Sequence, residues 1–369
     1  MKNKKIVVII VIITIVILAS AFIKNNVRIT ATKLEKAEGI TIVPTMNDKL
    51  MADSSWCGTF QLVWNDMKNE VVKKDIIFNP QLDIVKNLNK EDFNTTMLSK
   101  DYYFKTYGLK TLELKQEIEN GIKEKFNQTS DVLKDIDWSE EELNNPNDDS
   151  SKRYIFYTML YRKFDFWQEF DKLDNGKFGN KYNVEYFGID SKTKDSVGNQ
   201  IEVLYYNSKE DFAILINTKT NDEVIFCKSP KGNTFNEIYE NMNKNKNQYT
   251  GSKSFEYVDE FKAPKLNFNE KREYTELAGK KFKTANPNEI AEIEKAIQSI
   301  KFSLDEKGGE VKSESIIDMK VETTSVGKKE EKKNPRYFYV DDTFTIFLRE
   351  KGKSKPYFAG RVEDITKFQ

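Results

Sequence analysis

The chain has 369 residues, of which 38% are hydrophobic and 32% are charged. This size and composition allow a sizeable core in one large domain or two ordinary ones, so we expect a globular protein. Lysine plus arginine and aspartate plus glutamate both total 59. Because no net charge remains, no global field recruits nucleic acid, and any partner must be recognised locally.

Histidine is absent from the whole sequence. Histidine is the commonest general base and the commonest metal ligand, so its absence excludes Ser-His-Asp and Cys-His catalysis. Carboxylate-pair or lysine-based chemistry remains open, but perturbed groups rather than mere counts mark active sites. We therefore predict that the protein is not an enzyme and uses no metal or cofactor.

The N-terminus carries lysines followed by an apolar run, residues 6–23, that ends at Lys24. Ala19-Ser20-Ala21 fits the small-x-small rule for signal-peptide cleavage, whereas the run is also just long enough to span a bilayer. Cleaved signal peptide and retained anchor both stay open, and no cysteine follows directly to indicate a lipoprotein. By the positive-inside rule, we expect an extracytoplasmic protein, secreted or anchored to the outer face of the cell membrane.

The two cysteines, Cys57 and Cys227, would lie in an oxidising space, where a disulfide between them is permitted. Both also stand in apolar surroundings, next to Trp56 and Phe226, so two buried free thiols are the alternative.

Residues 24–52 show no regular pattern and are predicted to be a tether in front of a domain over residues 53–369. Apolar residues at helical spacing follow between Ser54 and Met67, and again over residues 111–126. Residues 73–78 resemble a strand, and Pro80 stands where a helix through Leu88 could begin.

The segment from Asp137 to Lys152 is acidic and rich in turn residues. It lacks the D-x-D-x-D-G order of a calcium loop, so we interpret it as a solvated loop. The aromatic run from Tyr154 to Phe170 then predicts a long strand and a short turn.

Strand patterns dominate the rest of the chain: residues 201–206, 212–217, 224–227, 255–266, 337–340, 344–349 and 357–362. Helical patterns follow Asn233 and span Tyr274 to Phe282, and the run ending at Leu304 fits a helix or a strand. Helices prevail in the N-terminal half and strands in the C-terminal half, without βαβ alternation. The pattern predicts one α+β domain with large antiparallel sheets.

Two stretches near the C-terminus resemble the serpin family. Asp305–Glu310, DEKGGE, is similar to the glutamate-glycine hinge that opens the serpin reactive-centre loop. FYVDDTF from Phe338, IFL from Ile346 and FAGRV from Phe358 look like the C-terminal signature F-x-A-D-H-P-F, an apolar strand and F-x-G-R-V.

Further segments occur in serpin order. They are Phe78–Pro80 for F-S-P, Tyr154–Phe170 for the strand L-V-L-V-N-A-I-Y-F-K-G-x-W, and Ala263–Leu266 with Tyr274–Leu277 for L-P-K-F and the helix after it. The resemblance covers roughly Ser54–Gln369. It implies a divergent, bacterial-type, membrane-targeted serpin-like protein, expected to be a monomer.

The resemblance implies inhibition without catalytic residues. A target serine protease would cleave the reactive-centre loop, about residues 306–337, and be trapped as the loop enters the main sheet. The implied hinge residues are Glu306, Gly308, Gly309 and Glu310. Counting the family's loop length from the hinge gives Glu322–Thr323 as the candidate scissile bond, with Lys320–Val321 as second choice.

Serpins carry a polar cluster beneath the point where this sheet opens. The matching positions here are Asn79 (with Leu82), Thr158 and Gln298, in place of the family's two serines, asparagine and histidine. Asn79, Thr158 and Gln298 can all donate and accept hydrogen bonds, so a substitute network is feasible.

Insertion into a sheet requires alternate side chains to enter the core. The family's run of alanines is missing, yet the sequence after the hinge has a period of two. One set is small or apolar: Gly309, Val311, Ser313, Ser315, Ile317, Met319 and Val321. Every charge lies in the other set: Glu310, Lys312, Glu314, Ile316, Asp318, Lys320 and Glu322. This separation favours inhibition, and a fixed strand in a non-inhibitory binding or structural protein is the alternative.

Overall fold

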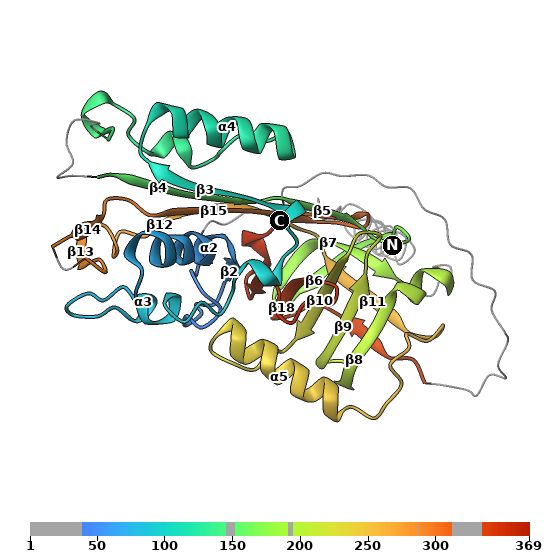
Figure 1. Cartoon of the computed structure of the whole chain (residues 1–369). Helices are drawn as coiled ribbons and strands as arrows, with labels where there is room; N and C mark the ends of the chain where they lie inside the picture. Colours follow the sequence, from blue (N-terminus) through green and yellow to red (C-terminus); the bar gives the residue numbers. More distant parts are fainter. Residues whose placement is uncertain (1–38, 145–151, 191–194, 287, 312–333) are drawn as a thin grey trace, which may run out of the picture. The chain divides into compact units, whose positions relative to one another are not determined.

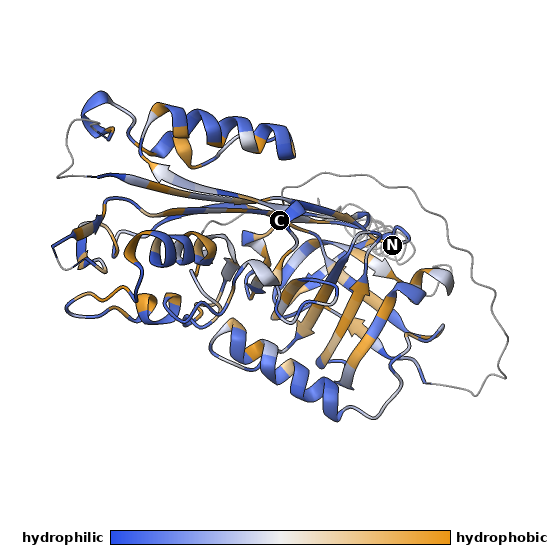
Figure 2. Cartoon of the chain, viewed as in Figure 1, coloured by the Kyte–Doolittle hydropathy of each residue, from blue (hydrophilic) through white to orange (hydrophobic). Residues whose placement is uncertain are grey.

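Antiparallel sheets form most of the structure, a computed structural model that describes residues 39–144, 152–190, 195–286, 288–311 and 334–369 (Figure 1). The largest sheet has the order β1-β2-β19-β18-β10-β9-β8. Its strands are Thr41–Ile42 (β1), Ser54–Cys57 (β2), Ile201–Ser208 (β8), Asp211–Asn217 (β9), Asp222–Lys228 (β10), Phe344–Glu350 (β18) and Phe358–Val362 (β19). The middle of β9 and of β10 is a continuous buried apolar run, visible as apolar colour in Figure 2, so this sheet is covered on both faces.

Two four-stranded sheets accompany the seven-stranded one. One has the order β17-β11-β7-β6 and the other β12-β15-β16-β5. Their strands are Tyr337–Tyr339 (β17), Glu260–Pro264 (β11), Lys181–Ile189 (β7), Asp171–Phe178 (β6), Leu266–Glu273 (β12), Ile297–Leu304 (β15), Gly308–Val311 (β16) and Arg162–Asp165 (β5). Two pairs complete the strands: Tyr103–Leu109 (β3) with Tyr154–Leu160 (β4), and Lys280–Lys283 (β13) with Ile290–Ile293 (β14).

Four α-helices lie among the described residues: Thr59–Asp66 (α2), Asp83–Leu88 (α3), Leu112–Phe126 (α4) and Phe235–Gln248 (α5). A π-helical turn, Met67–Val72, continues α2. Short 3₁₀ turns span Thr95–Met97, Lys100–Tyr102, Leu133–Asp135, Glu140–Glu142, Asp195–Gln200 and Ile365–Lys367. The predicted α+β class is confirmed.

The two longest helices begin where their sequences provide a cap. The Thr111 hydroxyl accepts from the Leu114 amide at the start of α4, and the Thr234 hydroxyl accepts from the Glu237 amide at the start of α5. The Glu237 carboxylate in turn accepts at 2.7 Å from the amide of Asn233, the residue before the N-cap, and so fixes the entry of the chain into α5. In Figure 1, α4 lies on one side of β4 and α2 on the other.

The predicted central strands, the C-terminal strands and the helices at 111–126 and after Asn233 are present. Three predictions of local structure were wrong. The helix predicted from Ser54 begins only at Thr59, because the buried residues before it pair with β19. Residues 73–78 form no strand. The segment Tyr274–Phe282, predicted to be a helix, is a turn followed by β13, which pairs with β14.

The predicted tether also needs correction. Ile40, Ile42, Val43 and Met46 are buried and belong to the same compact unit as the rest of the described residues. Strand β1 pairs with β2 in parallel, so apolar burial makes residues 39–52 part of the domain predicted to begin at 53. The predicted membrane segment, residues 6–23, lies outside the described residues, among which no helix is long and apolar enough to cross a bilayer.

Candidate functional site

The predicted hinge forms a tight connection between β15 and β16. The Asp305 amide donates to the Gly308 carbonyl at 2.9 Å, and the Lys307 amide donates to the Asp305 carboxylate at 2.9 Å. The carbonyls of Glu306 and Lys307 accept from the amides of Phe170 and Phe166, each at 2.9 Å. The turn is therefore held by its own chain and by the segment that follows β5.

Glu306 is a buried carboxylate with two lysine partners. Its oxygens lie 2.8 Å from Lys265 Nζ and 3.1 Å from Lys172 Nζ. Burial alone would raise the pKa of Glu306, but the hydrogen bond from Lys265, a backbone hydrogen bond and the one from Lys172 lower it to about 2. The carboxylate thus stays ionised and clamps the turn near neutral pH.

The two hinge glycines are required by close approach of the backbone. Gly308 has φ +154°, and a Cβ there would lie 2.1 Å from the Phe164 carbonyl oxygen. A Cβ on Gly309 would lie 2.5 Å from the Phe164 ring and 2.8 Å from the Ser303 carbonyl oxygen. Only glycine lets β16 lie this close to both neighbours.

Strand β16 is paired on both sides. Gly309 is opposite Leu304 of β15 and Phe164 of β5, and Val311 is opposite Arg162 of β5. Val311 is buried, whereas Glu310 is partly exposed, so these two side chains alternate across the sheet as predicted. The hinge is a short strand within the sheet β12-β15-β16-β5.

Beyond Val311 the described part of the sheet has a gap between β4 and β15, which we call the slot. Strand β16 keeps β5 and β15 two strand spacings apart, about 10 Å. Strand β4 precedes β5 in the chain and is separated from it by Tyr161, yet among the described residues β4 pairs only with β3, and no pairing joins it to β15. A cavity of about 90 Å³ lies there, with Thr158 and Leu160 of β4, Gln298 and Ile300 of β15, and Val311 among its lining residues.

Polar groups meet at the α2 side of the slot. Gln298 is buried; its Nε2 donates to the Cys57 carbonyl and to the Thr59 hydroxyl, both at 3.0 Å. Its Oε1 accepts from the Tyr274 hydroxyl at 2.8 Å. Thr158 Oγ1 is buried and has no hydrogen-bond partner among the described residues.

The structure thus brings Thr158 and Gln298 together but not Asn79. Asn79 is exposed and does not line the slot, because Cys57–Thr59, at the junction of β2 and α2, occupies the place assigned to it. The sequence prediction missed Thr59 and Tyr274. The signal that could have indicated Thr59 is the change from strand to helix after Cys57; the sequence pattern predicted a single helix from Ser54 to Met67 instead.

A segment after α4 covers the slot. Ser130, Asp131 and Val132 line the cavity from the side opposite α2. Lys271 Nζ donates to the Asp131 carbonyl at 3.1 Å and to the Asp135 carboxylate at 2.6 Å, and Lys295 Nζ donates to the Asp135 carbonyl at 2.8 Å. Because both lysines lie on the β12–β15 side, they hold this segment across the slot.

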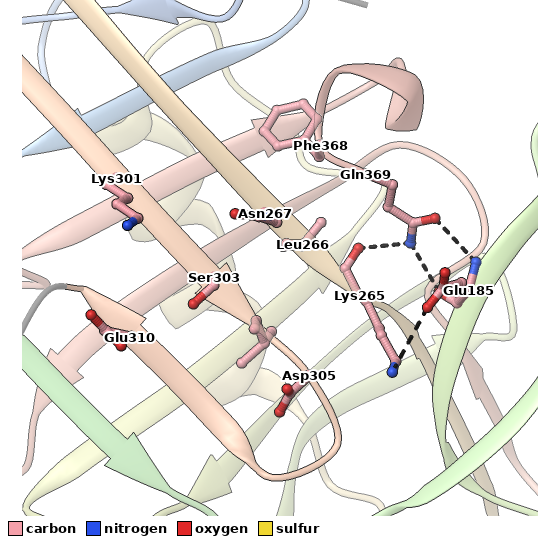
Figure 3. Close-up of a pocket in the computed structure, with 11 residues that line it drawn as sticks. Glu185, Lys265, Leu266, Asn267, Lys301, Ser303, Asp305, Glu310, Phe368 and Gln369 are labelled. Atoms are coloured by element: carbon pink, nitrogen blue, oxygen red, sulfur yellow. Dashed lines mark hydrogen bonds and ion pairs between the residues drawn. The ribbon is translucent and has the colours of Figure 1, made fainter. Parts of the chain in front are cut away.

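A larger cavity of about 440 Å³ adjoins the hinge (Figure 3). Asp305 and Glu310 of the hinge line it, together with Ser303 of β15. Gln369 closes one wall, since its Nε2 donates to the carbonyls of Lys265 at 2.7 Å and Glu185 at 2.9 Å. The lining of this cavity combines acidic, basic, amide and apolar side chains.

The two cysteines are free and buried. They lie on β2 and β10, which are separated by β19 and β18. Three strand spacings amount to about 14 Å, twice the separation of about 7 Å that a disulfide tolerates between Cα atoms. The disulfide permitted by sequence does not form in this fold, and burial raises the pKa of both thiols to about 11. Within the described residues, no cluster of cysteine and acidic side chains could hold a metal ion.

Part of the predicted site lies outside the described residues. This part comprises Ser313, Ser315, Ile317 and Met319 of the inserting face and both candidate scissile bonds, Glu322–Thr323 and Lys320–Val321.

Comparison with known proteins gives distant structural neighbours only. No family model matches the chain, and no curated protein matches it. Among solved structures, thyroxine-binding globulin in complex with thyroxine is similar at TM-score 0.45 and 13% identity, over 82% of this chain and 89% of that one. Serpin48 of the insect Tenebrio molitor has TM-score 0.37 and 13% identity over 72% and 78% of the two chains. Cleaved Serpin 42Da has TM-score 0.44 and 12% identity over 72% of this chain and 77% of that one.

Proposed function

We propose that this chain is a serpin-type inhibitor of serine endopeptidases that acts as a suicide substrate. A target protease would cleave the loop after the hinge, and the cleaved loop would enter the slot between β4 and β15. The protein would act outside the cytoplasm as a monomer, with residues 6–23 as signal peptide or membrane anchor. It would contribute a substrate bond and a strained fold rather than catalytic residues.

The observation that carries this proposal is the register of β16. Its pairings with β5 and β15 define which residues a continuing strand would meet. In that register, Ser313 would stand opposite Leu160 and Ile300, and Ser315 would stand opposite Thr158 and Gln298. Both pairs of neighbours line the slot.

This register explains the unpartnered hydroxyl in the slot. Within the described part of the chain, Thr158 Oγ1 is buried without a hydrogen bond, which costs roughly 1–3 kcal/mol for such a group. An inserted Ser315 would bring a hydroxyl to the same level of the sheet. In this register Ser315 would meet the polar neighbours Thr158 and Gln298, whereas Ser313 would lie between Leu160 and Ile300, and the charged set would face away from α2.

The test uses the full chain with two serine proteases. A trypsin-like protease tests cleavage at Lys320–Val321, and a glutamyl protease tests cleavage at Glu322–Thr323. We expect one of them to give a covalent complex that survives denaturing electrophoresis. Free protease with cleaved protein only would refute inhibition.

A matched pair of variants tests insertion itself. Ser315→Glu puts a charge on the inserting face, and we expect it to turn the inhibitor into a substrate. Lys312→Glu changes a charge on the outer face and should leave complex formation intact. Equal behaviour of the two variants would contradict the assigned faces.

A second candidate function is a non-inhibitory extracytoplasmic binding or structural protein. The observation in its favour is the pairing of β16 on both sides, which a permanently fixed strand would also have. A fixed strand has no strain to release, so cleavage in the loop should leave the melting temperature unchanged. A large rise after cleavage would eliminate this candidate.

A further inference from the structure

A buried ion network lies next to the end of the hinge strand. Arg162 is fully buried on β5, directly opposite Val311. Its Nε lies 2.6 Å from a carboxylate oxygen of Asp222, and its Nη1 lies 3.0 Å from one of Glu350. We call these three residues the Arg162 network.

The network joins the slot-bearing sheet to the seven-stranded sheet. Asp222 begins β10 and Glu350 ends β18, and the two residues are cross-strand partners. One guanidinium therefore binds the paired ends of two core strands. Because both carboxylates are buried, these contacts are protected from screening by solvent.

Neighbouring groups fix each member of the network. The Tyr357 hydroxyl donates to Asp222 at 2.8 Å, and the Ser99 amide donates to Glu350 at 2.9 Å. The guanidinium lies 3.5 Å from the centre of the Tyr102 ring, which precedes β3. The contact with Tyr102 thus holds the start of β3 against the Arg162 guanidinium.

This position is where the long strand changes its neighbours. Pairing of β4 with β3 ends at Leu160, and pairing of β5 with β16 starts at Arg162. A strand that enters the slot must widen the gap between β4 and β15 while the register of β16 on β5 is kept. A fixed point at Arg162 meets that requirement, since a slip by one residue would reverse every side chain.

We propose that Arg162, with Asp222 and Glu350, is a positioning residue for strand insertion: it anchors β5 to the seven-stranded sheet and keeps β16 in register as the slot fills. The inference rests on the proposed function, because it assigns a role in that same insertion.

The test variant must fold without the network. Arg162→Met alone leaves two buried carboxylates unpaired, so the triple variant R162M/D222N/E350Q is used, which removes all three charges of the Arg162 network. The control is R349M/E223Q, which removes the neighbouring ion pair of 2.6 Å on the same two strands. Arg349 also donates to Tyr239 of α5, so this pair faces away from β5.

Two measurements are made on each variant. The first is hydrogen exchange of the β16 amides in the intact protein; the second is the rate at which a synthetic peptide with the sequence of residues 312–322 anneals to the slot. We expect the triple variant to exchange β16 faster and to anneal the peptide about tenfold more slowly, a change of the size that one buried contact can produce. The control should match the wild type in both.

The outcomes separate the two proposals. If the wild type does not bind the peptide, the slot does not accept a strand and the proposed function fails. If the wild type binds it and the triple variant shows the same exchange and the same rate, the positioning role of Arg162 is refuted. Loss in both the triple variant and the control would show general destabilisation and also refute it.

Discussion

Replacing Gln298 by leucine should destabilise the protein through loss of a defined hydrogen-bond set. Leucine keeps a similar volume but leaves three partners unsatisfied: the Cys57 carbonyl, the Thr59 hydroxyl and the Tyr274 hydroxyl. At about 1 kcal/mol for each hydrogen bond, the free energy of unfolding should fall by about 3 kcal/mol. The environment is buried, so water cannot replace these partners.

A double-mutant cycle with Tyr274→Phe isolates one of these contacts. Tyr274→Phe alone should cost about 1 kcal/mol, because Gln298 Oε1 then lacks its donor. In the double variant the tyrosine hydroxyl is no longer left unpaired, so the two effects should fall short of additivity by about 1 kcal/mol.

Urea unfolding followed by tryptophan fluorescence measures each variant, since Trp56 and Trp64 are buried. Gln116→Leu, on the exposed side of α4, serves as the control and should change stability by less than about 0.5 kcal/mol. A Gln298→Leu variant as stable as this control, or additive effects in the cycle, would refute the assigned hydrogen bonds.

Three further predictions concern the hinge and the cover of the slot. Gly308→Ala should weaken β16, since its Cβ would lie 2.1 Å from the Phe164 carbonyl oxygen; unchanged hydrogen exchange of β16 would contradict this. Glu306 has a lowered pKa of about 2, so its stabilising effect is present above its usual pKa of 4.5 and is lost as the pH falls from there toward 2. Glu306→Gln should therefore be less stable than the wild type at pH 7 and equally stable near pH 2, as thermal melts at each pH would show; a constant difference would exclude this origin. Replacing both Lys271 and Lys295 by methionine releases the segment over the slot and should speed annealing of the 312–322 peptide; an unchanged rate would show that this segment does not limit entry.

Local patterns in the sequence were sufficient for much of the architecture. The continuous apolar runs in residues 212–217 and 224–227 and the apolar spacing over 111–126 predicted β9, β10 and α4, because each pattern depends only on residues close together in the chain. The hinge glycines and the alternation of Glu310 with Val311 were likewise visible, since both depend on residues next to one another.

The rest depended on residues distant in the chain. The sequence of residues 39–52 predicts a tether, and only the pairing of β1 with β2 shows that these residues belong to the domain. Asn79 was predicted to lie at the slot, but Thr59 at the start of α2 is the residue that contacts Gln298 there.

By itself, the sequence determined the α+β class, most strands and a hinge with glycines that no other residue could replace, because these follow from local periodicity and backbone sterics. Only the tertiary structure decided that Cys57 and Cys227 are too far apart to bond, that Gln298 meets Tyr274, and that Arg162 is buried between Asp222 and Glu350. Each of these depends on strand order and packing between segments that are far apart in the chain, and no spacing of residues records that order.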